Sequence, residues 1–251
     1  MTGYFDPSRP RVLAHRGLAL QAPENTPLAF AYAIEAGAAH IETDVHASSD
    51  GVAIIAHDPD LRRVAGRGER IGELSAAQLA RIDLGRDQGL VPLVEVLDGF
   101  PETRFNIDVK DPLAVGPTAE AILRANAVDR VLITSFSDAR RRATVALLPG
   151  VATSASAGSF IAALLAGKLG LAPGVRRALR GLDAVQIPER ALGMSTVTAR
   201  AIRGFQAAGV EVHVWTVNDP ARMRELFALG VDGIVTDRAD LAVRSANGDT
   251  L

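Results

Sequence analysis

The stretch Ile41-Glu42-Thr43-Asp44-Val45 decides how the rest of the chain is interpreted. Its residues alternate with β-branched side chains, which favours a strand, and the two-residue period of a strand directs Glu42 and Asp44 to the same side. Two neighbouring carboxylates repel each other unless a cation offsets them, and Mg²⁺ or Ca²⁺ prefers such oxygen ligands. The alternative is a strand with one solvated face, although parallel strands are usually covered on both faces.

Composition limits the classes of protein that the chain can belong to. It has 251 residues, 48% of them hydrophobic, and 27 basic against 29 acidic residues, a size that suits one barrel as well as two smaller domains. We predict a single domain over residues 1–251. No basic surplus favours nucleic acid or an anionic membrane as an obligate partner, and the oligomeric state is not predicted.

Cysteine is absent from the sequence, so neither a disulfide nor a thiolate metal site can form. The first ten residues lack the apolar core of a secretory signal, and no apolar run reaches the roughly 18 residues of a transmembrane helix. We therefore expect a cytoplasmic protein with no transmembrane segment.

Short apolar strands alternate with helical segments along the chain. Thr26 before Pro27 and Asp219 before Pro220 are typical of a helix start, and Ser75 begins a capping box. Four glycines, each followed by Ala or Val, indicate helix ends: Gly37, Gly150, Gly209 and Gly230. The candidate strands are 12–17, 39–46, 52–57, 103–110, 130–136, 151–156, 184–189, 210–217 and 232–237, one more than a (β/α)₈ barrel needs.

The surplus strand is 52–57. Too few residues separate it from 39–46 for a parallel crossover, whereas Asp50-Gly51 between two apolar runs is typical of a hairpin. We therefore predict an α/β protein with a TIM (β/α)₈ barrel and an extra antiparallel hairpin strand after the second barrel strand. The register then places His57 roughly opposite Asp44. If His57 is instead part of a simple turn, no such proximity is expected.

Polar residues gather where the predicted barrel strands end, which is where active sites of such barrels lie. His15 and Arg16 follow the first strand, His57 ends the hairpin, and Asp108 and Lys110 share one face of the next barrel strand. Each alone is more often structural. Their coincidence with Glu42 and Asp44 on consecutive strands instead predicts one site at the mouth of the barrel.

The residue types at this mouth indicate phosphodiester cleavage. Glu42, Asp44 and Asp108 provide oxygen ligands for one divalent cation, Mg²⁺ or Ca²⁺, and argue against zinc. The positive charges of Arg16 and Lys110 suit an anionic substrate that bridges metal and cations. Two histidines that titrate near neutrality, His15 and His57, can activate the nucleophile and protonate the leaving alkoxide.

The sequence resembles the glycerophosphodiester phosphodiesterase family in order over residues 12–240. The resemblance rests on His15-Arg16-Gly17, Ala22-Pro-Glu-Asn-Thr26, Glu42-x-Asp44, Asp50-Gly51, His57-Asp58, Asn106-Ile-Asp-Val-Lys110, Ser135-Phe136, Trp215-Thr-Val-Asn218 and Gly230-Val-Asp-Gly-Ile-Val-Thr-Asp237. It implies a TIM barrel that hydrolyses glycerophosphodiesters, with metal, to glycerol 3-phosphate and an alcohol.

By the same resemblance, His15 acts as general base and His57 as general acid. Glu42, Asp44 and Asp108 hold the metal, whereas Arg16 and Lys110 contact phosphate. Two features depart from the family: Asp108 stands where a glutamate is usual, which can alter metal distance or preference, and 61–66 lacks a common threonine pair, so the leaving alcohol is not predicted.

Two further features leave alternatives open. The apolar segment 158–172 follows a strand on the mouth side, and it either contacts a lipid-like substituent of the substrate as a lid or packs as a helix against the barrel or another subunit. Trp215 either lines the glycerol side of the site or packs in the core.

Two other functions also remain open. A lysophospholipase D-like enzyme would use the apolar segment for its substrate, and a related lyase would release a cyclic phosphate. A barrel that only binds phosphorylated ligands should lack part of the catalytic set, yet both histidines, the three acids, Arg16 and Lys110 are all present.

Overall fold

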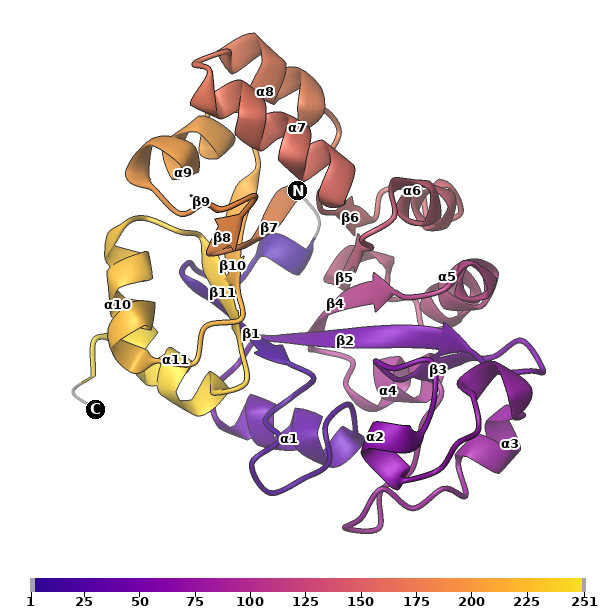
Figure 1. The fold of residues 1–251 in the computed structure, drawn as a ribbon. Coiled ribbons are helices and arrows are strands. Elements are labelled where there is room, and N and C mark those ends of the chain that lie inside the picture. The colour runs from indigo at the N-terminus through magenta and orange to yellow at the C-terminus, as the bar shows by residue number, and fades with distance from the viewer. Residues whose placement is uncertain (1–2, 250–251) are drawn as a thin grey trace.

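The computed structural model describes residues 3–249, and within them eight parallel strands form a barrel (Figure 1). The strands are β1 (Arg11–His15), β2 (His40–Ala47), β4 (Arg104–Val109), β5 (Val131–Thr134), β6 (Ala152–Thr153), β7 (Ala184–Pro188), β10 (Glu211–Trp215) and β11 (Gly233–Thr236). Their spatial order is β6-β5-β4-β2-β1-β11-β10-β7, and a parallel bridge between Ser154 and Ala184 joins the two ends. The predicted TIM barrel is confirmed.

Helices surround the barrel, as Figure 1 shows. They are α1 (Pro27–Glu35), α4 (Leu93–Gly99), α5 (Val115–Arg124), α6 (Asp138–Ala146), α7 (Ala157–Lys168), α8 (Ala172–Ala178), α9 (Ala199–Gln206), α10 (Pro220–Ala228) and α11 (Ala239–Asn247). The side chains of Thr26 and Asp219 cap α1 and α10 as predicted. All four predicted end glycines have positive φ, the left-handed conformation expected there.

The predicted hairpin is present, with one correction to its register. β3 (Ala53–Ile55) pairs antiparallel with β2, and Val45 lies opposite Ile55. The Ala56 amide donates to the Asp44 carbonyl, so Ala56 and not His57 is opposite Asp44. The turn is therefore one residue tighter than predicted, and His57 lies just beyond the strand.

The loop after β3 has a small core of its own, separate from the barrel core. Its buried side chains are Ile54, Ala56, Leu61, Ile71, Leu79, Ile82 and Leu90. The segment contains the short elements α2 (Arg62–Ala65), a 3₁₀ turn (Ile71–Glu73) and α3 (Ala76–Leu79), whose capping box at Ser75 is formed as predicted. This core gives the segment that follows His57 a packed support.

The opposite end of the barrel is closed by a short 3₁₀ turn, Gly3–Phe5. Tyr4 is fully buried and packs against residues of β5, β6 and β7, and the His40 Nε2 lies 2.9 Å from the Tyr4 carbonyl oxygen. Arg11 reaches Glu211 through two hydrogen bonds of 2.7 and 2.9 Å. The N-terminal ends of the strands are thus sealed by packing and by a buried ion pair.

Candidate active site

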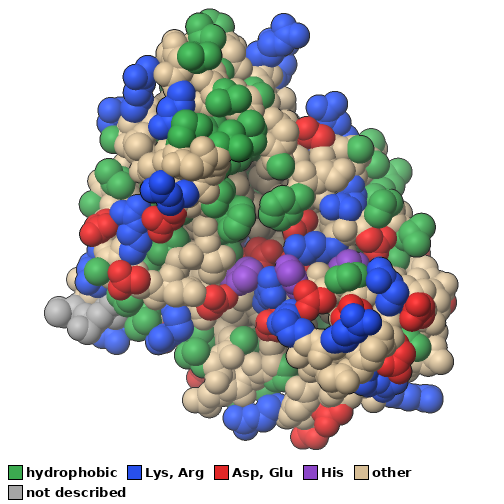
Figure 2. Space-filling view, viewed as in Figure 1, with side chains coloured by type: hydrophobic (Ala, Val, Ile, Leu, Met, Phe, Trp, Pro, Cys, Tyr) green, Lys and Arg blue, Asp and Glu red, His purple; other side chains and the backbone are tan. Residues whose placement is uncertain are grey.

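A cavity of about 440 Å³ opens where the barrel strands end, and every residue predicted for the site lines it. These residues are His15, Arg16, Glu42, Asp44, His57, Asp108, Lys110 and Trp215. Figure 2 shows histidine, acidic and basic side chains gathered in the hollow at the centre of this face. Strand register explains the convergence, since His15 pairs with Glu42 and Asp44 pairs with Asp108 on neighbouring strands.

The turn after β1 needs a glycine to form. Arg16 has a φ of 56° and donates its amide to the Glu42 carbonyl, so the chain after β1 stays close against β2. Gly17 follows with a φ of 87°, and a β-carbon there would come within 2.7 Å of the Ala29 backbone. Only glycine meets both conditions, and this turn aims His15 and Arg16 into the cavity.

Each of the two histidines has a carboxylate partner at Nδ1. His15 Nδ1 lies 2.6 Å from Asp237 Oδ1, and His57 Nδ1 lies 2.7 Å from Asp58 Oδ1. A carboxylate at Nδ1 favours the tautomer that has its proton on that nitrogen, which leaves Nε2 available for proton exchange. The structure therefore presents two His-Asp pairs at one cavity.

The pair at His15 is held in place by a third side chain. The Asn218 amide donates to Asp237 at 2.7 Å, while the Asn218 oxygen accepts from the Asp237 backbone amide. Burial disfavours the charged form of His15, but the hydrogen bond to Asp237 and the charge of Glu42 outweigh it, so the pKa of His15 is raised. Its imidazole is therefore a stronger base than a free histidine.

A chain of ion pairs links His57 to the other side of the mouth. Arg63 contacts Asp58 at 2.5 Å and Glu24 at 2.7 and 2.8 Å, and Glu24 in turn accepts from Arg16 at 2.9 Å. Burial would raise the pKa of Glu24, but the two guanidinium groups hold it below its ordinary value. The loop that carries His57 is thereby tied to the turn that carries Arg16.

The three predicted metal ligands are buried carboxylates that differ in how closely a positive charge approaches them. Burial, reinforced by the charge of Asp44, raises the pKa of Glu42 to about 8. Burial also raises the pKa of Asp108, although Lys110 offsets part of the effect. The Lys110 ammonium lies 2.9 Å from Asp44 and 2.7 Å from Asp108. It compensates two of the three acids, whereas Glu42 faces the imidazole of His15, whose Nε2 lies 3.9 Å from Glu42 Oε2.

Several buried polar atoms in the cavity have no hydrogen-bond partner. Among residues 3–249, half of the buried polar side-chain atoms without a hydrogen bond line this cavity: Arg16 Nε, Glu42 Oε2, Asn106 Oδ1, Asp108 Oδ1 and Gln186 Nε2. Buried polar groups normally have partners. Three of these atoms are acceptor oxygens, so the chemistry of the donor set fits a hard divalent cation.

The arrangement of the acids differs from a finished metal site. Within the described part of the chain, no three acidic or histidine side chains are placed so that they could hold a metal ion. Lys110 bridges Asp44 and Asp108 instead, and Asp44 also accepts from Asn25 at 3.1 Å. A divalent cation would therefore have to compete with the Lys110 ammonium for these oxygens.

Aromatic and apolar side chains form the other wall of the cavity. Trp215 is half-buried there, edge-on to the exposed ring of Phe136 with 6.1 Å between centroids, so it lies in the site and not in the core. The predicted apolar segment becomes α7, of which Phe160 and Ile161 line the same wall. The remainder of α7 packs against α8 and α9.

Sequence reasoning missed the partners of the two histidines. Asp58 adjoins His57 in the sequence, and Asp237 follows β11, which pairs with β1 when the barrel closes. Strand order alone could have placed Asp237 beside His15. Glu24 and Arg63 gave no such signal, because their meeting depends on how two loops pack.

The fold and cavity define a TIM-barrel enzyme whose site suits an anionic substrate. Residues 15–241 match the glycerophosphoryl diester phosphodiesterase family. The chain is 43% identical over 231 residues to the probable glycerophosphodiester phosphodiesterase 2 of Mycobacterium tuberculosis, covering 91% of this chain and 88% of that protein. The chain therefore belongs to the glycerophosphoryl diester phosphodiesterase family and is a phosphoric diester hydrolase.

Solved structures agree with this assignment. A glycerophosphodiester phosphodiesterase from Thermotoga maritima is 26% identical with a TM-score of 0.74, over 93% of this chain and 96% of that one. A phosphodiesterase from Oleispira antarctica, in complex with the product sn-glycerol-3-phosphate, has a TM-score of 0.79 at 22% identity, over 95% and 97% of the two chains. The second likeness supports the fold.

Proposed function

We propose that this enzyme hydrolyses glycerophosphodiesters to glycerol 3-phosphate and an alcohol, with one divalent cation and two histidines. The observation that carries the proposal is the pair of His-Asp contacts, at 2.6 and 2.7 Å, on one cavity that also holds Arg16 and Lys110. Two proton-transfer groups suit a reaction in which one proton is taken and another given. The product bound to the Oleispira relative, sn-glycerol-3-phosphate, is consistent with this chemistry.

The histidines divide the proton transfers between them. His15, whose pKa Asp237 raises, accepts a proton from the attacking water, and His57, oriented by Asp58, protonates the leaving alkoxide. Arg16 and Lys110 bind the phosphoryl oxygens by charge-assisted hydrogen bonds. Trp215 and its neighbour Phe136 give the glycerol an apolar surface to lie on.

Glu42, Asp44 and Asp108 would hold the cation, either Mg²⁺ or Ca²⁺, because the donor set is all oxygen. When bound, it would supply Lewis-acid stabilisation of charge on the phosphoryl group. The unpaired Glu42 and Asp108 oxygens support this assignment. Asp108 is shorter by one methylene than the usual glutamate of the family, so its distance to the cation is the one most expected to differ from that in relatives.

The test is an activity screen with glycerophosphocholine, followed by release of glycerol 3-phosphate. Prolonged chelation should abolish turnover, and added Mg²⁺ or Ca²⁺ should restore it. Turnover that survives complete removal of divalent ions would refute the metal assignment while leaving the histidines in place. Phosphorus NMR of the product checks the attacking group: a cyclic phosphate would show that a glycerol hydroxyl, and not water, attacks.

A lysophospholipase D-like activity is the second candidate. Phe136 is 61% exposed at the mouth, and with Phe160, Ile161 and Trp215 it forms an apolar wall that could contact an acyl chain. Turnover of a long-chain lysophospholipid should then exceed that of glycerophosphocholine. An equal or faster rate on the small diester would remove this candidate.

A further inference from the structure

The segment 157–180, which forms α7 and α8, has a charge unlike that of the whole protein. It carries Lys168, Arg176, Arg177 and Arg180 and not one acidic residue, although the formal net charge of the chain is −2. All four basic side chains are exposed. The overall balance therefore conceals a local surface that is cationic.

Exposed leucines gather where α7 turns into α8. Leu165, Leu169 and Leu171 are 44%, 74% and 53% exposed, and the first two lie one helical turn apart on the same side of α7. The hairpin stands at the top of Figure 1, and in that part of Figure 2 hydrophobic and basic side chains gather while acidic ones are scarce. Apolar side chains grouped in this way usually mark an interaction surface.

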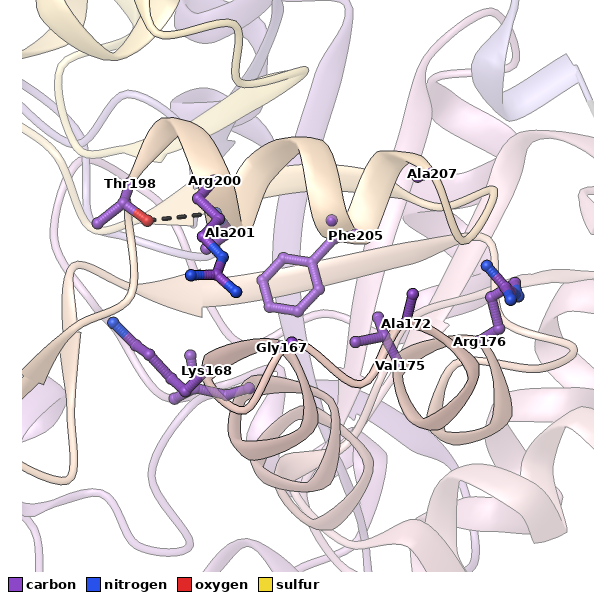
Figure 3. A pocket seen from close by; sticks show the side chains of 13 residues that line it. Gly167, Lys168, Ala172, Val175, Arg176, Thr198, Arg200, Ala201, Phe205 and Ala207 are labelled. Atoms are coloured by element: carbon purple, nitrogen blue, oxygen red, sulfur yellow. Dashed lines mark hydrogen bonds between the residues drawn. The ribbon is translucent and has the colours of Figure 1, made fainter.

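A cleft of about 330 Å³ lies behind this turn, between the hairpin and α9. Its walls include Leu164, Val175 and Phe205, and Figure 3 shows Lys168 and Arg200 to one side of Phe205 and Arg176 to the other. No membrane-spanning helix contributes to this surface, since none of the helices within residues 3–249 has the length and apolar character to cross a bilayer. We call Leu165, Lys168, Leu169, Leu171, Arg176 and Arg200 the cationic tip.

The cations of the tip are not neutralised by acids of the described residues. Over the described residues, Arg176 and Arg200 contact no carboxylate, and Lys168 donates to the Ser195 carbonyl oxygen at 3.2 Å. Arg200 Nη2 lies 3.3 Å from where a β-carbon of Gly170 would be, which places this charge beside the exposed leucines. Arginines near the active site, such as Arg16 and Arg63, are by contrast engaged by acids.

We propose that the cationic tip binds the anionic surface of a phospholipid membrane. Leucines that enter the interface and flanking Lys and Arg that bind acidic headgroups are the combination such binding requires. A second copy of the chain is disfavoured, because a symmetric contact would place cations against cations. Nucleic acid is disfavoured because exposed leucines contribute nothing to phosphate contacts.

Docking at the tip would bring the active site near the membrane. The first turn of α7, with Phe160 and Ile161, lines the catalytic cavity, while the far end of this 12-residue helix carries the tip. At 1.5 Å per residue the two ends are about 18 Å apart. The inference concerns where the enzyme works and not which bond it cleaves, so it is independent of the proposed catalytic roles.

The test is flotation of the purified full-length enzyme with two kinds of vesicle, one of phosphatidylcholine alone and one that also contains phosphatidylglycerol. The wild type should bind only the anionic vesicles, and binding should weaken as salt is raised. The variant Leu169→Gln/Arg176→Gln should bind them about tenfold or more weakly, with unchanged turnover of water-soluble glycerophosphocholine.

A matched variant on another face is the control. Leu123→Gln/Arg124→Gln on α5 also removes one exposed leucine and one exposed arginine and should bind the vesicles like the wild type. The proposal is overturned if the wild type ignores the anionic vesicles, or if the tip and α5 variants bind equally. Gel filtration that shows a dimer in the wild type but not in the tip variant would also overturn it in favour of a second copy.

Discussion

Glu42 and Glu211 lie at opposite ends of the same barrel and have opposite electrostatics. Glu211, at the N-terminal end of β10, contacts Arg11 at 2.7 Å and His213 at 3.1 Å. Burial acts against its charge, but these partners lower its pKa to about 2. Glu42, toward the mouth, keeps an oxygen without a hydrogen bond and has a pKa raised to about 8. At the closed end of the barrel the buried carboxylate is paired and stabilises the fold. At the mouth the buried carboxylate has an oxygen that is free to contact a ligand.

The largest effect is expected on turnover, from the two histidines at the mouth. His15→Ala and His57→Ala should each lower kcat by about 10²-fold or more, because each removes a proton-transfer group. That loss corresponds to about 3 kcal/mol of transition-state stabilisation. Steady-state kinetics on glycerophosphocholine, with circular dichroism to confirm folding, measures it.

His213→Gln serves as the control for these variants. His213 is fully buried at the closed end of the barrel and should affect thermal stability while leaving the turnover of the folded enzyme near that of the wild type. Near-wild-type turnover in either His15→Ala or His57→Ala would contradict the assigned roles.

The next effect is on stability at the closed end. Glu211→Gln leaves Arg11, which is only 4% exposed, without its carboxylate, and breaking such a pair costs about 3 kcal/mol. The melting temperature should fall by roughly 6–12 °C for a chain of this size. Turnover of the folded enzyme at low temperature should stay the same. A fall in kcat without a fall in melting temperature would contradict a purely stabilising role for Glu211.

The same ion pair predicts a pH dependence. Because folding lowers the pKa of Glu211 from 4.5 to about 2, its contribution to stability is present above pH 4.5 and is lost as the pH falls toward 2. The difference in unfolding free energy between wild type and Glu211→Gln should therefore shrink across that window. A difference that is constant in urea titrations from neutral to acid pH would refute the charge interaction.

The smallest effect on stability is expected at the mouth. Glu42→Gln replaces a buried carboxylate that has an unpaired oxygen, so in metal-free buffer it should leave stability unchanged or raise it by about 1 kcal/mol. Activity should be lost all the same. Calorimetry measures the melting temperature of the variant. A marked fall would show that Glu42 stabilises the fold as Glu211 does.

Much of the barrel could be predicted because its signals are local. Each predicted strand overlaps an observed one, and the end glycines and capping residues act within a few positions of the helix that they close. The position of the candidate site residues around one cavity could be predicted because parallel strands bring their carboxyl ends to one rim. Glu42, Asp44 and Asp108 needed only strand periodicity and strand order.

The rest depends on contacts between distant segments. The register of the hairpin was wrong by one residue, because a turn can tighten without changing its sequence signal. Side-chain placement decides that Lys110 bridges Asp44 and Asp108, and no spacing in the sequence predicts this. The cationic surface over 157–180 was not predicted, because the net charge of the whole chain averages over its basic and acidic regions.

The contact between His15 and Asp237 spans almost the length of the chain. The histidines, acids and cations proposed for the reaction all precede residue 111 in the sequence, but the side chains that orient His15 arrive only with the last two strands. During translation, a nascent chain that has not yet released residue 237 from the ribosome lacks an oriented base. With the role proposed for His15, activity therefore requires the final strand to have joined the first.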